Sequence, residues 1–238
     1  MITRMTRACA LLLATALGLS GCASEGEDRG NLLLETGGAV FQSVRARAAG
    51  DTGPAPKVQI TAQQLANTKV AALQVNPEKQ GGSDFLRRIA QRRDDTPGIV
   101  AVWRASDNAQ LFIRNGVLVG TRGVGNDIIS SDATPTVLAV AGARAGRGER
   151  RYFVSDGGYG QTEVVLSCDI ANLGAEPVQI VNLAFQTVHL RETCVGGAAD
   201  RVRIVNDYWV QPGSGTVRKS RQWAGPLAGH FELLLLKD

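Results

Sequence analysis

The sequence predicts a mainly β protein, either an antiparallel β-sandwich or a barrel-like meander, with short helices near its N-terminus. Three observations lead to this prediction. From Pro97 onward the apolar residues recur with a period of two, turn-forming residues return at short intervals, and no long helical pattern separates the expected strands. Because parallel strands need long connections, usually helices, the last observation excludes a doubly wound parallel sheet.

The expected strands begin with a three-strand meander over residues 99–104, 110–114 and 117–121. The strongest signal within it is Asn115-Gly116, because a two-residue type I′ turn needs positive φ at both positions. Further strands are expected at residues 151–155, 162–170, 178–190, 201–210, 215–222 and 230–236.

The chain before Pro97 is expected to mix short helices with short strands. Asn31 and Thr61 can each cap a helix through a side-chain oxygen. The expected elements are helices over 31–48, 61–67 and 84–93 and strands over 58–60 and 69–75. The last helix carries a basic cluster that we interpret as a solvated face, formed by Arg87, Arg88, Arg92 and Arg93.

The N-terminal residues have the features of a bacterial lipoprotein signal. Arg4 and Arg7 precede an apolar stretch over 8–19, which is too short to span a bilayer as a mature helix. The sequence Leu19-Ser20-Gly21-Cys22 then resembles the lipobox, in which the cysteine receives a diacylglyceryl group and becomes the acylated N-terminus. Ala23 follows where a retention signal would place Asp, which indicates the outer membrane of a Gram-negative cell. The alternative is an ordinary secretory signal with a coincidental cysteine.

We therefore expect a signal peptide over 1–21, a lipidated tether with a helix over 22–56, and a β-rich domain over 57–238. Acyl chains on Cys22 would attach the protein to the periplasmic face of the membrane, since two or more chains make attachment effectively stable. Removing the signal peptide takes two of the 26 basic residues and leaves 24 against 22 acidic ones. With this balance and no basic run interleaved with aromatic residues, no nucleic-acid partner is expected. A second basic cluster is interpreted as solvated, with an anionic partner as the alternative: Arg144, Arg147, Arg150 and Arg151.

The cysteines sort by position. Cys9 leaves with the signal peptide and Cys22 is acylated, so Cys168 and Cys194 remain as the ordinary thiols. In an oxidising periplasm, two thiols indicate a disulfide. The alternative makes Cys194 a nucleophile with His189 as its base.

Searches for catalytic chemistry find little. His189 and His230 are the only histidines, so a metal site is not expected, and no cofactor fingerprint is present. Gly213-Ser214-Gly215 lacks the strand-to-helix context of a nucleophile elbow. A glycosidase would need two carboxylates at a defined separation, which the sequence cannot provide. The carboxylates considered for such a pair are Asp156, Glu163, Asp169 and Glu192. We expect a protein without enzymatic activity.

Aromatic residues indicate where a glycan or partner could be contacted. Tyr208, Trp209 and Trp223 lie on neighbouring expected strands, and Arg221 is close to them in sequence. Stacking rings with hydrogen-bond donors form a carbohydrate-facing platform in this interpretation. The alternative is that these rings are core residues.

Several segments resemble the YjbF-like lipoproteins, also called GfcB or YmcC, of bacterial exopolysaccharide and capsule loci. The matching segments, in order, are 102–107 (VWRASD), 113–119 (IRNGVLV), 121–123 (TRG), 208–210 (YWV), 215–223 (GTVRKSRQW) and 225–226 (GP). The resemblance implies a mostly β outer-membrane lipoprotein that works beside a periplasmic partner and an outer-membrane barrel protein in polysaccharide secretion. It brings no established catalytic residues.

The leading hypothesis is thus a nonenzymatic accessory of exopolysaccharide or capsule export, anchored through Cys22 and in contact with the export machinery or the polysaccharide. One rival is a purely structural envelope lipoprotein. A second is a polysaccharide-modifying enzyme of the periplasm.

Overall fold

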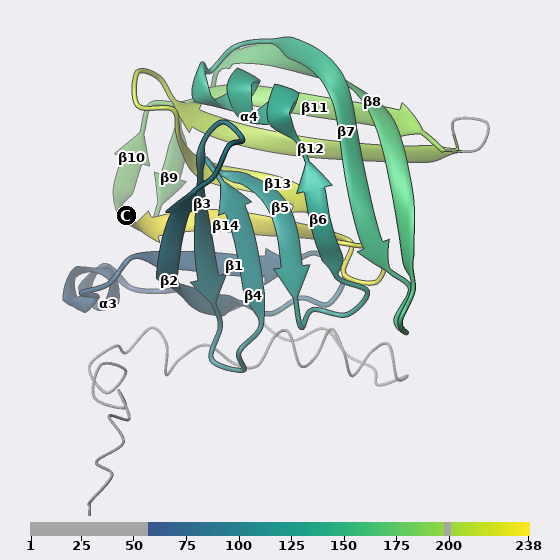
Figure 1. Ribbon diagram of the computed structural model, residues 1–238. Coiled ribbons are helices and arrows are strands. Elements are labelled where there is room, and N and C mark those ends of the chain that lie inside the picture. The colour runs from purple at the N-terminus through teal and green to yellow at the C-terminus, as the bar shows by residue number, and fades with distance from the viewer. Residues whose placement is uncertain (1–56, 198–200) are drawn as a thin grey trace, which may run out of the picture. The chain divides into compact units, whose positions relative to one another are not determined.

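The structure, a computed structural model, describes residues 57–197 and 201–238. Twelve strands form one antiparallel sheet in the order β5-β4-β3-β2-β1-β14-β13-β12-β11-β8-β7-β6. The sheet curls until its two edge strands approach each other, so that it is barrel-like and nearly closed (Figure 1). A separate two-stranded sheet of β9 and β10 and the helices α3 and α4 complete the described part. The expected mainly β, antiparallel fold is confirmed.

The elements have the following bounds: α3 (Ala62–Asn67), β1 (Ala72–Pro77), β2 (Asp84–Arg93), β3 (Ile99–Arg104), β4 (Gln110–Arg114), β5 (Val117–Arg122), β6 (Ile128–Asp132), α4 (Thr134–Ala141), β7 (Gly146–Ser155), β8 (Gln161–Ala175), β9 (Val178–Ile180), β10 (Leu183–Phe185), β11 (Val188–Gly196), β12 (Val202–Gln211), β13 (Thr216–Trp223) and β14 (His230–Lys237).

The turn and the helix cap that the sequence predicts from local residue types are both confirmed. Asn115 and Gly116 have φ of 45° and 86°, as a type I′ turn between β4 and β5 requires. A Cβ on Gly116 would lie 2.2 Å from the Cγ2 of Val217, so the position also needs glycine for packing. Thr61 caps α3 with a complete capping box, in which its hydroxyl accepts from the backbone N–H of Gln64.

The helix expected over 84–93 is wrong, because these residues form strand β2 between β1 and β3. The cause is burial on both faces. Leu86 packs inside the barrel-like sheet, whereas Phe85 packs in a cluster on its outer side, so the alternation that marks a strand is lost.

Two further expectations need correction. Residues 58–60 form no strand, and the single strand expected over 178–190 is divided into β9, β10 and the start of β11. The division occurs at Val181, whose φ of 56° turns the chain. Both β6 and α4 were not expected. The signal peptide, Cys22, the tether and the helix over 31–48 lie outside the described residues.

The core is divided between the two sides of the sheet. Inside, apolar residues of β1 to β5 pack against β14 and the loop that precedes it, and a second group packs around α4. Outside, α3, β9 and β10 cover apolar residues of β1, β2, β12 and β14. This outer layer buries side chains that a sheet with one solvated face would expose.

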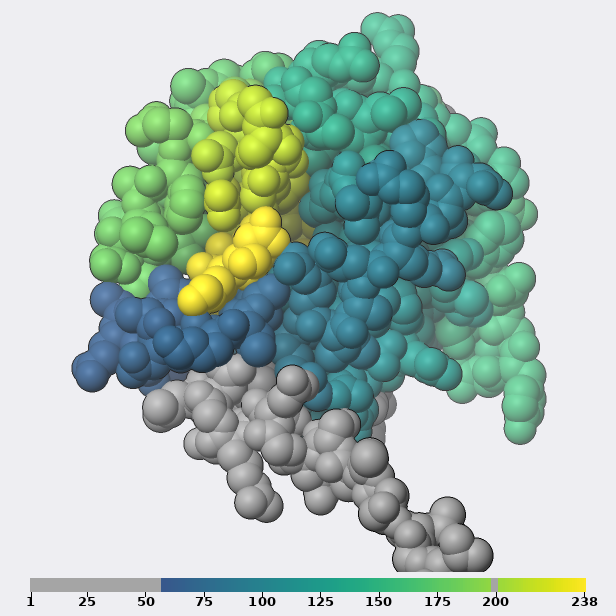
Figure 2. Space-filling view, turned by 60° about the vertical axis from the view of Figure 1, so that its left-hand side comes forward, coloured from purple at the N-terminus to yellow at the C-terminus, as the bar shows by residue number. Residues whose placement is uncertain are grey.

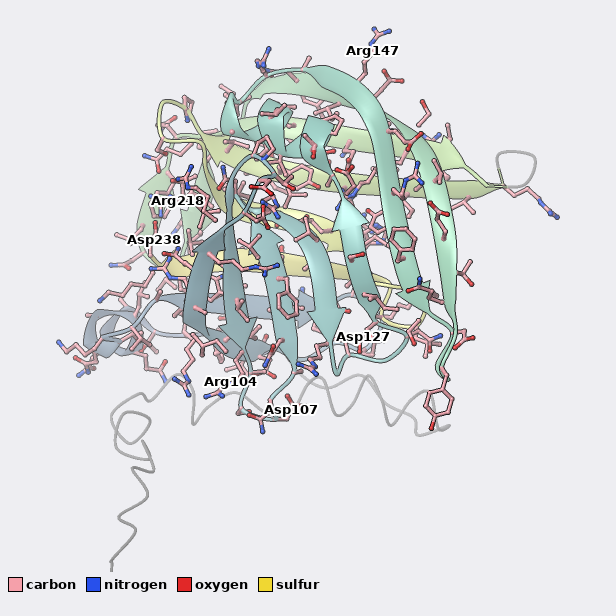
Figure 3. All side chains as sticks on the ribbon, in the orientation of Figure 1. Arg104, Asp107, Asp127, Arg147, Arg218 and Asp238 are labelled. Carbon is pink, nitrogen blue, oxygen red and sulfur yellow. A yellow bond between two sulfur atoms is a disulfide. The ribbon has the colours of Figure 1, made fainter. Side chains whose placement is uncertain are left out.

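The seam between the edge strands β5 and β6 is closed by side chains. Asp127, labelled in Figure 3, lies in the loop between them and accepts from the Thr121 hydroxyl at 2.9 Å. It also accepts from the N–H groups of Gly123 and Val124 at 2.8 and 2.9 Å. The N–H of Ile128 donates to the Thr121 hydroxyl at 3.0 Å. These bonds join the edges where the described residues show no backbone ladder.

Candidate functional site

Tyr208 lies in the barrel interior beside a buried ion pair. Arg150 of β7 donates to Glu192 of β11 at 2.5 Å, and both side chains are at most 1% exposed. The Tyr208 hydroxyl donates to the same Glu192 oxygen at 3.2 Å. Arg150 therefore does not belong to a solvated cluster, which corrects that expectation, and Tyr208 is buried, as in the alternative that the rings are core residues. The reason is strand alternation, because Arg150 shares the inward side of β7 with Tyr152 and Val154.

The ion pair is enclosed by hydrogen-bond donors and acceptors. Glu192 also accepts from the Thr136 hydroxyl of α4 and from the Asn206 amide of β12. Arg150 donates to the backbone carbonyl of Leu118 on β5 at 2.8 Å. Burial opposes the charge of Arg150, but the Glu192 carboxylate holds the pKa of Arg150 above its usual value. The glutamate oxygens are thus committed to links between β7, β11, β12 and α4.

Cys168 and Cys194 are joined by a disulfide between directly opposed residues of β8 and β11. Both are buried on the inner face. His189 lies on the other face of β11, where its ring stacks on Trp209 at 4.4 Å between centroids. The alternative pairing of a Cys194 nucleophile with a His189 base is therefore not formed.

Trp209 packs on the outer side of the sheet, beneath the layer of α3, β9 and β10. It is 9% exposed, and Lys219 lies 4.7 Å from its ring centroid. Arg221 holds Glu78 with two hydrogen bonds of 2.6 and 2.7 Å and donates to the Val205 carbonyl at 3.2 Å. Trp209 and Arg221, which were both expected on the aromatic platform, are therefore engaged by neighbouring groups of the protein.

Trp223 lines an open cleft, which we call the Trp223 cleft, of about 550 Å³. Its ring is half-buried and meets the Tyr152 ring edge-on, with centroids 5.1 Å apart. The wall of the cleft is apolar and formed by Val154, Val164, Val202, Ile204 and Trp223. Its rim is formed by Asn126, Ser155, Asp156, Thr162, Arg201, Arg203 and Pro226. An aromatic ring with polar groups around it suits a sugar ring, which has apolar faces and hydroxyl edges.

The four residues expected to contact a glycan are thus not brought together. Tyr208 and Trp209 are consecutive in β12 and face opposite sides of the sheet. Arg221 lies over the outer face, and Trp223 alone lines the cleft. Sequence analysis did not identify the rest of the lining, including Asn126 and Arg203, which come from a loop and from β12. Glycan contact by any of these residues stays a prediction.

The carboxylates considered for catalysis have separate surroundings. Asp156 accepts from the N–H groups of Gly158 and Gly160 in the turn after β7. Glu163 pairs with Arg151 at 2.5 Å on the surface. Asp169 is exposed, whereas Glu192 is enclosed in the interior. His230 donates from Nε2 to the Val205 carbonyl at 2.9 Å, and burial together with the charge of Arg221 lowers the pKa of His230.

Similarity to a known family decides the classification. The family described as "Group 4 capsule polysaccharide lipoprotein gfcB, YjbF" matches residues 35–236. The chain belongs to the YjbF family. This membership agrees with the resemblance of the segments around Trp103, Asn115 and Trp223, and it makes the chain a member of a capsule-associated lipoprotein family.

Solved structures support the fold of this YjbF family member. The crystal structure of the hypothetical lipoprotein YmcC from Escherichia coli (K12) has a TM-score of 0.64 and 20% sequence identity to it. The match covers 84% of this chain and 97% of that chain. No curated protein matches the sequence. Among the described residues, no helix combines the length and the apolar character that crossing a membrane requires.

Proposed function

We propose that this protein is a nonenzymatic accessory of capsule or exopolysaccharide export. It is anchored by an acylated Cys22 on the periplasmic face of the outer membrane, and it presents its β-rich domain to periplasmic and outer-membrane barrel partners of the export system. The observation that carries the proposal is the YjbF family match over residues 35–236, joined to the lipobox that precedes it. The committed contacts of Asp156, Glu163 and Glu192 support the absence of a catalytic carboxylate pair.

The anchor is tested in cells that lack the native gene. Complementation with the wild-type chain should restore surface polysaccharide and place the protein in the outer-membrane fraction. Cys22→Ser should abolish incorporation of labelled palmitate, release the protein from the membrane and fail to restore export. Full export by an unacylated Cys22→Ser protein would contradict the anchored role.

Glycan contact is assigned to the Trp223 cleft. The full chain is titrated calorimetrically with the polysaccharide purified from the same cells. Trp223→Ala should weaken binding about tenfold, because loss of a stacked ring removes about 1.4 kcal/mol of binding free energy. Trp209→Phe is the matched control and should leave binding unchanged, since Trp209 lies outside the cleft.

Two rivals predict other results. A purely structural lipoprotein would show no saturable binding of the polysaccharide. A polysaccharide-modifying enzyme would shorten or deacylate the polymer on incubation, which size-exclusion chromatography and acetate release would detect.

A further inference from the structure

The wall of the barrel-like sheet is interrupted beside β2. The ladder between β1 and β2 ends at Arg87, but β2 continues to Arg93 with β3 as its neighbour. The ladder between β13 and β14 ends at Lys219, whereas β13 begins at Thr216. In the described part of the chain, no strand joins the free stretches of β2 and β13. Figure 2 views this side, with β14 in yellow between the blue strands and the yellow-green ones.

A cavity of about 270 Å³ lies at this interruption, and we call it the Trp103 cavity. Buried residues of its lining are apolar except for Ser220, and they comprise Leu73, Trp103, Ile113, Ser220 and Leu233. The Ser220 hydroxyl already accepts from the Gln222 amide at 2.9 Å. Polar residues at the cavity include Gln91, Asn115, Ser214, Thr216 and Asp238. An apolar interior with a few polar groups is typical of ligand pockets, which occur in the mouths of barrels.

The positively charged side chain of Arg88 lies beside this cavity. The Arg88 guanidinium carbon lies 5.7 Å from the Trp103 ring centroid. Its Nη1 donates to Asp238 at 2.8 Å, and Asp238, labelled in Figure 3, is itself part of the lining. The side chains of Arg88 and Asp238 are 25% and 60% exposed. Because exposed ion pairs are weak, a carboxylate entering the cavity can replace Asp238 on Arg88.

We propose that the Trp103 cavity binds the acyl chain of a fatty carboxylate. The hydrocarbon tail lies among Leu73, Trp103 and Leu233, and the carboxylate binds Arg88. A sugar fits this interior poorly, because its hydroxyl groups would lose water and find few partners there. The charge of Arg88 favours an anionic head over a neutral one. This site is separate from the Trp223 cleft, with which it shares no lining residue.

The test uses Trp103 as its own reporter. Trp103, Trp209 and Trp223 are the only tryptophans, so a Trp209→Phe, Trp223→Phe variant of the full chain, kept soluble in an amphipol, fluoresces from Trp103 alone. Titration with 11-bromoundecanoate should quench this emission saturably, since bromine quenches tryptophan on contact. Octanoate, decanoate and dodecanoate should reverse the quenching. Each added methylene should tighten binding about fourfold until the cavity is full.

Variants distinguish binding of the ligand in the Trp103 cavity from partition of the ligand into the amphipol. Ala101→Leu places extra carbons against the cavity and should weaken binding at least tenfold, whereas Ala90→Leu, at an exposed position of the neighbouring strand β2, should not. Arg88→Gln should weaken undecanoate but not undecanol, and Asp238→Asn should tighten undecanoate. Quenching that does not saturate, that is unchanged by Ala101→Leu, or that is equal for acid and alcohol would overturn the proposal.

Discussion

The buried pair of Arg150 and Glu192 offers the sharpest test of how this interior is stabilised. Glu192 receives four donors in a site where both charged groups are at most 1% exposed. Glu192→Gln removes the negative charge and sets an amide donor against Arg150 or Asn206. Breaking a buried pair by removing one partner costs about 3–5 kcal/mol, because the remaining charge is uncompensated. We expect Glu192→Gln to lower the free energy of unfolding by that amount.

The assay is urea unfolding followed by far-UV circular dichroism at neutral pH, with equal slopes showing that the midpoint shift reports stability. Arg150→Met should also destabilise the domain. The double variant Arg150→Met, Glu192→Leu should be more stable than either single variant, since it leaves no unpaired charge. A loss below about 1 kcal/mol for Glu192→Gln, or additive losses in the double variant, would refute this account of the pair.

Three further outcomes are expected. Burial raises the pKa of Asp84 from 3.8 to about 7. The stability that the neutral carboxyl group contributes is therefore fully present below pH 3.8 and is lost as the pH rises through 7. Asp84→Asn should raise the free energy of unfolding above pH 7 by up to about 4 kcal/mol and flatten the pH profile of the urea midpoint. Replacing Cys168 and Cys194 together by alanine should cost about 3 kcal/mol in thermal or urea unfolding, and a double variant as stable as the oxidised protein would count against the bridge. Gly116→Ala should cost at least 1 kcal/mol, because its φ is 86° and its Cβ would meet Val217 at 2.2 Å, whereas unchanged stability would show that the turn relaxes freely.

Elements with local signals were predictable from the sequence. The strands at 99–104 and 110–114 agree with β3 and β4 at both ends, because each alternates and is bounded by a turn. β2 was not predictable in the same way, since its apolar residues face two cores and its arginines fall at helical spacings. The helix α4 was missed as well, although Pro135 in its first turn and the Asp132 side chain that accepts from Thr134 are both start signals.

Strand alternation alone could have predicted the buried ion pair of Arg150 and Glu192. Arg150 has the same parity as Tyr152 and Val154, and Glu192 has the same parity as Leu190 and Cys194. Two opposite charges at inward positions of different strands predict a buried pair. What could not be derived from the sequence is which strands meet, because the order β11-β8-β7 depends on the pairing of the whole sheet.

The same alternation explains why the aromatic platform was only partly predictable. Tyr208 and Trp209 are consecutive in a strand, so one of them must face each side, and strand alternation alone excludes a platform that uses both. Which side is solvated is a tertiary property. In a one-layered barrel Trp209 would be exposed, but β9, β10 and α3 cover it, and β9 and β10 pair with each other because the stretch over 178–190 turns at Val181. Recognition is therefore expected in the Trp223 cleft and in the Trp103 cavity, and not on the outer face of the sheet around Trp209.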